Sequence, residues 1–240
     1  KRQPIENQPL VSFIKCLFDL AVDGFQSDSV FRFLKTGLLG VPSDHIALCE
    51  NYTFAWDING SKWQSEWTAN PEGFQGEMGE REKEDLRNIN TLREKVVSLV
   101  SGFKESVKDE TGRVITEKLY RFLIDNKVGE ELKNYALSLQ DEGHFELALE
   151  QEQVWDVLME VLDEIAGALG SKPISLKRYS EIFELIVSSK SLGKLPDGFD
   201  EVSVLVADRV STKHSKVVFV LGLNAGVFPL GQPSNGFFSI

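Results

Sequence analysis

The sequence predicts a predominantly α-helical protein of the α/β class. Across roughly the first 195 residues, apolar side chains recur every three or four positions, as on the buried face of a helix. The pattern then changes: Val202, Val204 and Val206 alternate with other residues, and residues 216–221 form a short, almost wholly apolar run. Alternation is typical of a half-buried strand, and such a run is typical of a strand covered on both faces. Strands are therefore expected only late in the sequence.

Eight helices are expected before these strands. They cover about residues 9–18, 27–38, 43–54, 86–107, 116–123, 130–139, 145–169 and 175–186. Pro9 suits the first turn of a helix, and Ser27 or Asp28 opens the second helix with a capping box. Glycines at 37 and 40 end the second helix, a Pro- and Gly-containing loop fills 68–80, and Gly112 breaks the long fourth helix.

The expected strands need partners, because two strands alone do not make a stable sheet. These partners would come from the start of the chain or from sequence that is not present here. Residues 236–240, at the end of the sequence, are mostly apolar and show no helix stop signal or polar tail. We therefore expect the sequence to belong to a longer protein.

Composition indicates a globular protein with one large or two modest domains. The chain has 240 residues, of which 42% are hydrophobic, and no apolar run approaches the 18 residues of a membrane span. Cys16 and Cys49, the two cysteines, both lie in apolar helical patterns. We expect buried free thiols, which fit a reducing cytoplasm better than a disulfide does.

The negative charge is concentrated in one segment. The net charge of the chain is −11, and residues 129–170 contain eleven acids and one base, Lys133. An acidic face repels phosphate, so this segment is not expected to hold DNA. The ordinary interpretation is a solvated helix face. The alternative is a surface that docks a basic partner or keeps DNA on another path.

The sequence contains no complete motif for a common catalytic site. It lacks the phosphate-binding G-x-x-x-x-G-K-[ST] and the nucleophile elbow G-x-S-x-G. His45, His144 and His214 are far apart and lack the spacing of metal ligands, so each is expected at a surface or a helix end. Pairs of carboxylates on acidic helices arise by chance and predict no acid–base catalysis.

Two local clusters are candidates for DNA contact. Lys62 and Trp63 lie among the tryptophans at 56, 63 and 67, and aromatics beside a base can stack on nucleobases. The alternative is a loop packed on its own tryptophans. The second cluster lies between the expected strands, where a loop could meet a phosphate backbone or simply be solvated. Its candidate residues are Arg209, Lys213, His214 and Lys216.

The end of the sequence resembles the region around motif V of superfamily 1 helicases. Gly222, Gly226, Phe228 and Pro229 match its closing turn, whereas the Lys-Gly-Leu element of its loop is missing. Most of the chain is similar to the B-subunit family of the bacterial AddAB (RexAB) helicase–nucleases. The most specific strings are F-x-x-L-K-T-G-L at 31–38 and G-x-N-x-G-x-F-P at 222–229, supported by residues 9–11, 50–52, 60–63, 152–155 and 208–209.

This resemblance implies a split architecture. Residues 1–40 and 196–240 would form a helicase-like second motor domain of the P-loop NTPase type (2A-like), and 41–195 would be its helical insertion (2B-like). The resemblance also implies a parent enzyme that uses ATP, Mg²⁺ and an iron–sulfur cluster, all bound outside this chain. DNA, single- and double-stranded, and the A subunit would be its partners in the cytoplasm, in double-strand break processing and recombinational repair.

Two hypotheses follow for the chain itself. The first is a noncatalytic scaffold that guides DNA and contacts the partner subunit, and the missing Lys-Gly-Leu element fits a motor half that no longer couples ATP to movement. The alternative is an all-helical interaction module of the cytosol that docks a basic protein through residues 129–170.

Overall fold

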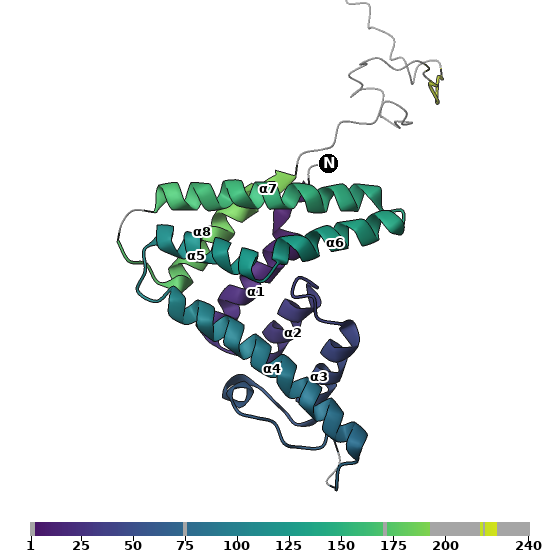
Figure 1. The fold of residues 1–240 in the computed structure, drawn as a ribbon. Coiled ribbons are helices and arrows are strands. Elements are labelled where there is room, and N and C mark those ends of the chain that lie inside the picture. The colour runs from purple at the N-terminus through teal and green to yellow at the C-terminus, as the bar shows by residue number, and fades with distance from the viewer. Residues whose placement is uncertain (1–2, 74–75, 170–171, 193–216, 218, 225–240) are drawn as a thin grey trace, which may run out of the picture. The chain divides into compact units, whose positions relative to one another are not determined.

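A computed structural model describes residues 3–73, 76–169, 172–192, 217 and 219–224 of the chain. The described part of residues 1–195 forms one compact unit, and residues from Pro196 onward belong to a second. Helices dominate the first unit (Figure 1). The expected helical class is therefore confirmed.

Every expected helix is present in the described residues. The helices are α1 (Pro9–Asp23), α2 (Ser27–Lys35), α3 (Ser43–Ala55), α4 (Glu80–Ser106), α5 (Gly112–Asp125), α6 (Val128–Asp141), α7 (Phe145–Ala168) and α8 (Leu176–Ser189), with 3-10 turns η1 (Ile5–Asn7) and η2 (Gly60–Gln64). Two short strands, β1 (Gln3–Pro4) and β2 (Ser191–Leu192), pair antiparallel and bring the two ends of the unit together.

Helix α1 is the centre of the unit because it is apolar on nearly every side. It packs against α2, α4, α7 and α8 (Figure 1). The ring of Phe18 lies 6.3 Å from Phe103 on α4 and meets Tyr179 and Phe183 of α8 edge-on, at 5.8 and 5.5 Å between centroids. Edge-to-face pairs of this kind add to the free energy gained by burying the rings.

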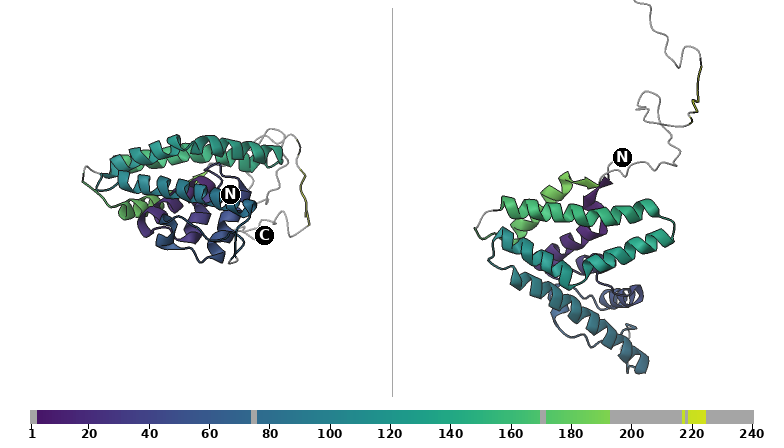
Figure 2. Two further views of the ribbon diagram at one scale, coloured as in Figure 1. Left: turned by 60° about the horizontal axis from the view of Figure 1, so that its bottom comes forward. Right: turned by 45° about the horizontal axis from the view of Figure 1, so that its top comes forward.

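The hydrophobic core continues across residue 40, where the split-domain hypothesis puts a boundary. Side chains of α1 and α2 share one core with those of α3, α4, α5 and α8. Helices α6 and α7 form an antiparallel pair beside α5 and α1 (Figure 2). The division into 1–40 with 196–240 and 41–195 stays a prediction.

Three local expectations were wrong. Ser27 does not cap α2 with its side chain; its Oγ donates to the Ile58 carbonyl (2.6 Å), and its N–H donates to Asn59 Oδ1 (2.8 Å). Helix α4 begins at Glu80, six residues before the first apolar position used to place it. Gly112 is the first residue of α5, which begins after Thr111, whose side chain accepts from the Val114 N–H. Glycine is needed at 112 because a Cβ there would lie 2.3 Å from the Leu169 side chain.

The expected strands fall mostly outside the described residues. Those at 202–206 are not described. Within the apolar run at 216–221, Val217 and 219–221 are described, and they are exposed and carry no strand. The expectation of a covered strand is wrong for these residues, since a strand is buried only when neighbouring strands and helices cover it. None of the described helices has the length and hydropathy of a bilayer-crossing segment.

Both cysteines are buried free thiols, as expected. Burial raises the pKa of the Cys16 thiol, and it raises the pKa of Cys49 from 9.0 to about 12. Burial also raises the pKa of Tyr179 from 10.0 to about 12, although its hydrogen bond with Thr116 opposes the shift. All these groups favour their neutral form in the folded chain.

These shifts predict alkaline destabilisation. Between pH 9 and 12 the Cys49 thiol ionises in the unfolded chain but keeps its proton in the folded one. Stability from this group is therefore complete below pH 9 and is lost as the pH rises toward 12, by up to about 1.4 kcal/mol per pH unit. Urea midpoints measured at several pH values check this. In Cys49→Ala the decline should be shallower; an unchanged slope would contradict the assignment to Cys49.

Candidate functional site

The tryptophan cluster is an interior structure. Trp63 has 0% exposure and Trp67 is 4% exposed. Their rings meet edge-on at 4.9 Å, and Trp67 stacks on Tyr52 at 5.2 Å. The Trp63 indole N–H donates to Ser27 Oγ at 3.1 Å. Trp63 therefore offers no ring face to a nucleobase. Its burial supports the alternative, a loop packed on its own tryptophans.

Lys62 is half exposed, unlike the two buried tryptophans. Its Nζ donates to the Asp57 carbonyl and lies 3.6 Å from the Asp57 carboxylate. An exposed pair of this kind is weak, so the ammonium stays available to another anion. Lys62 keeps its place as a candidate for phosphate contact.

Arg93 is a buried cation that supports the tryptophan cluster. Its guanidinium donates to the Trp63 carbonyl (3.1 Å), to Asn90 Oδ1 (3.0 Å) and to the Glu94 carboxylate (3.0 Å). It also lies over the Trp67 ring, 5.9 Å from the centroid. These partners give Arg93 a structural role. The sequence does carry a signal for this role, because Arg93 is a basic residue on the otherwise apolar stripe of α4 that includes Ile89, Val96 and Val100.

The other DNA-contact candidates, Arg209, Lys213, His214 and Lys216, lie outside the described residues and stay predictions. His45 and His144 are exposed at the starts of α3 and α7, as expected. Among the residues that the structure describes, no group of three or more His, Cys, Asp or Glu side chains is arranged to hold a metal ion.

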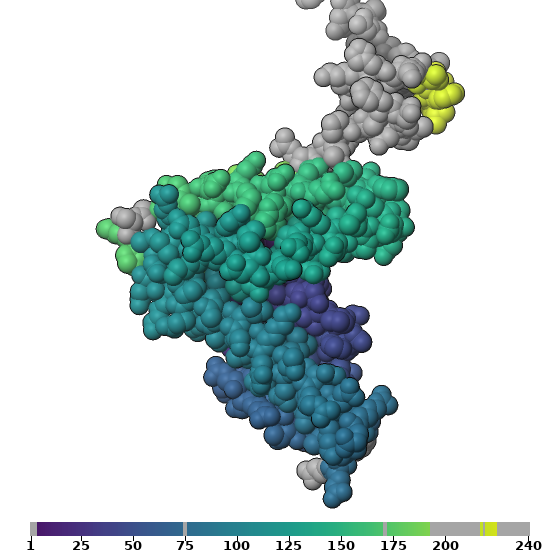
Figure 3. Space-filling view, in the orientation of Figure 1, coloured from purple at the N-terminus to yellow at the C-terminus, as the bar shows by residue number. Residues whose placement is uncertain are grey.

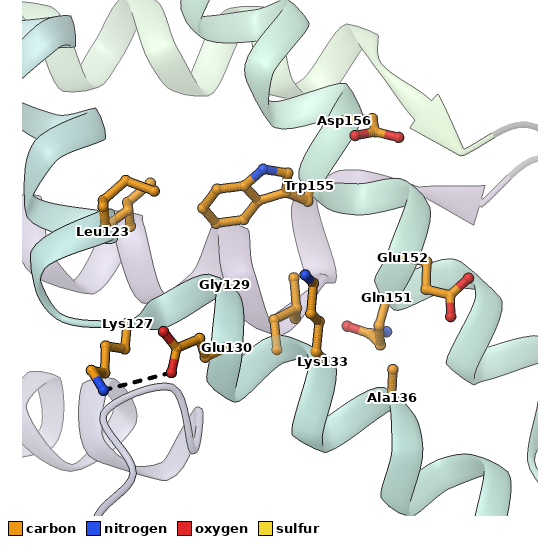
Figure 4. A pocket seen from close by; sticks show the side chains of 12 residues that line it. Leu123, Lys127, Gly129, Glu130, Lys133, Ala136, Gln151, Glu152, Trp155 and Asp156 are labelled. Atoms are coloured by element: carbon orange, nitrogen blue, oxygen red, sulfur yellow. Dashed lines mark ion pairs between the residues drawn. The ribbon is translucent and has the colours of Figure 1, made fainter.

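A groove of about 480 Å³ runs between α6, α7 and the end of α5 (Figure 4). Its walls are mainly apolar. They include Leu123, Ile124, Leu132, Ala136 and Trp155. The Trp155 ring lies against the backbone of α6 because residue 129 is glycine, where a Cβ would approach the ring to 3.3 Å. The groove depends on two helices meeting, which no local pattern in the sequence indicates.

Gln151 lies at the groove with an unsatisfied acceptor. The residue is 5% exposed, and its buried Oε1 has no hydrogen-bond partner. Its Nε2 donates to Gln8 Oε1 at 2.8 Å, and Gln8 Nε2 donates in turn to the Glu150 carboxylate at 3.2 Å. Because an ionised carboxylate only accepts, this relay fixes the orientation of both amides. The Gln151 Oε1 atom therefore faces away from the relay, into the groove (Figure 4).

An orphaned acceptor of this kind costs about 1–3 kcal/mol in a folded protein. A glutamine between Ala148 and Val154 on the buried stripe of α7 was the sequence signal that was missed.

Charged side chains surround the groove and make its rim acidic. Glu130, Glu152 and Asp156 are exposed acids, whereas Lys127 and Lys133 are bases. Lys127 forms an ion pair with Glu130 at 3.7 Å. The remaining charges of the rim are Lys133 and the two acids of α7, Glu152 and Asp156, so acids outnumber bases. The helix pair around the groove belongs to the segment with a net charge of −10. Figure 3 shows the surface of α6 and α7 on one face of the unit.

The curated proteins that the chain resembles share one name. No protein-family model matches the chain. The curated B subunit of the ATP-dependent helicase/deoxyribonuclease of Caldanaerobacter subterraneus subsp. tengcongensis is 32% identical over 98% of this chain and 20% of its own length. The B subunits of the same name from Thermoanaerobacter sp. and Clostridium acetobutylicum are each 30% identical, over 98% and 100% of this chain and 21% of their own length.

The chain matches a segment of helicase/deoxyribonuclease B subunits. It spans about one fifth of the length of these relatives. The resemblance found from residues 31–38 and 222–229 is thereby confirmed.

The cofactors that the sequence resemblance implies do not fit the residues of this segment. An iron–sulfur cluster needs four thiolates, whereas this chain has two cysteines, both buried with raised pKa values on separate helices. A P-loop site for ATP and Mg²⁺ needs the phosphate-binding motif that the sequence lacks. The segment therefore supplies no ligand set for either group.

Proposed function

We propose that the chain is a noncatalytic, helicase-like segment of an ATP-dependent DNA helicase/exonuclease that acts in double-strand break processing and recombinational repair. It would guide DNA and contact the partner subunit of the intact enzyme in the cytoplasm. The observation that supports this proposal is the similarity over 98% of the chain to proteins named as B subunits of an ATP-dependent helicase/deoxyribonuclease. The absence of a phosphate-binding motif from the sequence supports the noncatalytic role.

The division of labour within the chain follows from charge. In this proposal, residues 1–40 and 196–240 belong to a split motor-like domain, and 41–195 to its helical insertion. Arg209, Lys213 and Lys216 form the most basic stretch of the motor-like part, in a protein with a net charge of −11. The acidic α6 and α7 pair would stay off the DNA, since like charges repel. ATP, Mg²⁺ and an iron–sulfur cluster would serve the parent enzyme outside this chain.

The first test measures catalysis and DNA binding by the purified 240-residue chain. We expect no ATP hydrolysis above background, with or without single-stranded DNA, and binding to single-stranded DNA that weakens with salt. Replacing Arg209, Lys213 and Lys216 by glutamine should make the salt dependence shallower by about 2 log units per log unit of salt, because each phosphate contact contributes about 0.7.

The matched control replaces three exposed bases elsewhere, Lys104, Arg121 and Lys172, by glutamine and keeps the net charge of the first variant. It should retain the original salt dependence. DNA-stimulated ATP hydrolysis by the pure chain would refute the noncatalytic role. Equal effects of both triple variants would refute the assignment of DNA contact to the basic stretch.

A further inference from the structure

The groove between α6 and α7 holds an acceptor without a donor, apolar walls and an acidic rim. From these features we infer that it docks a basic amphipathic segment of a protein partner, which inserts an apolar side chain beside Trp155 and donates an N–H to Gln151 Oε1. This inference deepens the subunit-contact part of the proposed function and rests on it for the origin of the partner.

The orphaned Gln151 oxygen indicates what the occupant must offer. The relay from Glu150 through Gln8 occupies the amide nitrogens and leaves only Oε1 at the groove. An acceptor needs a donor, so the occupant must offer an N–H or O–H group there. Arginine, lysine and amide side chains carry such donors, and so does a free backbone N–H.

The apolar walls indicate that the occupant also brings apolar surface. Ile124 is 48% exposed at the groove, and Trp155 is half buried. Helical spacing extends the apolar surface along both helices: Leu137 follows Lys133 by one turn, and Leu149 precedes Glu152 by three positions. Both leucines are exposed, at 57% and 36%. A helix with apolar residues one turn apart matches such a surface.

The charge around the groove decides between classes of partner. Glu152 and Asp156 are exposed on α7, and the segment from 129 to 170 has a net charge of −10. This field repels the phosphates of a nucleic acid and repels a second copy of the same surface. It attracts Lys and Arg side chains and so speeds and orients the approach of a basic segment. Charge complementarity therefore favours a basic protein segment over DNA or a dimer.

The test uses the 240-residue chain and a fluorescein-labelled helical peptide of about five turns, with leucines on one face and lysine and arginine on the other. Binding is followed by fluorescence anisotropy. A scrambled peptide of the same composition and a peptide with glutamate in place of the bases are the comparison probes. We expect the basic amphipathic peptide to bind at least about tenfold more tightly than either.

Two pairs of variants locate the binding. Glu152→Lys with Asp156→Lys should weaken peptide binding at least about tenfold, whereas Glu77→Lys with Glu84→Lys, exposed acids before and on α4, should retain most of it at the same net charge. Gln151→Met removes the acceptor and should weaken binding. Gln153→Met makes the same change two positions further along α7, outside the groove lining, so it should retain affinity. Circular dichroism and Tm confirm that each variant is folded.

Each contrary outcome overturns the inference. Equal binding of the basic amphipathic and scrambled peptides, or equal loss in both charge-reversal variants, would show that only net charge matters. Equal binding of the glutamate peptide would show that the charge of the occupant does not matter. Weaker binding of a labelled single-stranded oligonucleotide to the Gln151→Met variant than to the unchanged chain would reassign the groove to nucleic acid. A dimer in sedimentation that dissociates in the Glu152→Lys, Asp156→Lys variant would reassign it to a second copy. The peptide assay needs no DNA or ATP, so its failure is distinct from failure of the proposed function.

Discussion

Alanine in place of Phe18 is expected to lower the free energy of unfolding by about 3–5 kcal/mol, the range for deleting a buried aromatic ring. The ring is 1% exposed and lies where α1, α4 and α8 meet. Its loss leaves a cavity beside Phe103 of α4 and beside Tyr179 and Phe183 of α8, and closing that cavity would require these two helices to move toward α1. The shift of the urea midpoint, measured by circular dichroism, checks the value.

The control for this prediction is Phe54→Ala. Phe54 is 90% exposed at the end of α3, so its removal opens no cavity. We expect a change within about 0.5 kcal/mol, as for most surface substitutions. If the two variants lose similar stability, the packing of α1 at the centre of the unit is refuted.

Alanine in place of Trp63 is expected to cost about 3–5 kcal/mol as well. The side chain fills the space between Phe31 and Trp67, and its indole N–H is bonded to Ser27, which itself fastens the loop at Ile58. Its loss should loosen the connection between α3 and α4. Trp56→Ala is the matched control, because Trp56 is only partly buried and should cost less.

A second substitution at Trp63 distinguishes a role in packing from a role in DNA contact. Trp63→Leu keeps part of the buried apolar volume but has no ring to stack, and it should leave affinity for single-stranded DNA nearly unchanged in the folded protein. A residue that stacked on a base would contribute about 1–3 kcal/mol to binding. Anisotropy titrations of the chain with a labelled oligonucleotide, at a temperature where both proteins are folded, measure the difference. A folded Trp63→Leu variant that loses about fivefold or more in affinity, the equivalent of about 1 kcal/mol, would restore the stacking hypothesis.

Local patterns predicted most helices because their apolar stripes are long. The starts of α4 and α5 were misplaced for different reasons. The first turn of α4, from Glu80, is polar and has no apolar stripe to mark it. Helix α5 begins at a glycine that was taken for a break, although Ile115 in its first turn lies on its buried face. The capping box predicted at Ser27 is wrong because its hydroxyl donates instead to the carbonyl of Ile58, 31 residues away in the sequence.

Sequence by itself determined the helical class, the order of the helices, the buried thiols, the acidic segment and the family resemblance. Each of these depends on residue type or on spacing within about one helix. Tertiary structure decided that Trp63 is enclosed, that Arg93 holds the tryptophan loop, and that α6 and α7 meet in a groove. The bond between Gln8 and Gln151 joins residues 143 positions apart. Contacts over such separations depend on how helices pack, and helical periodicity contains no information on which stripe meets which.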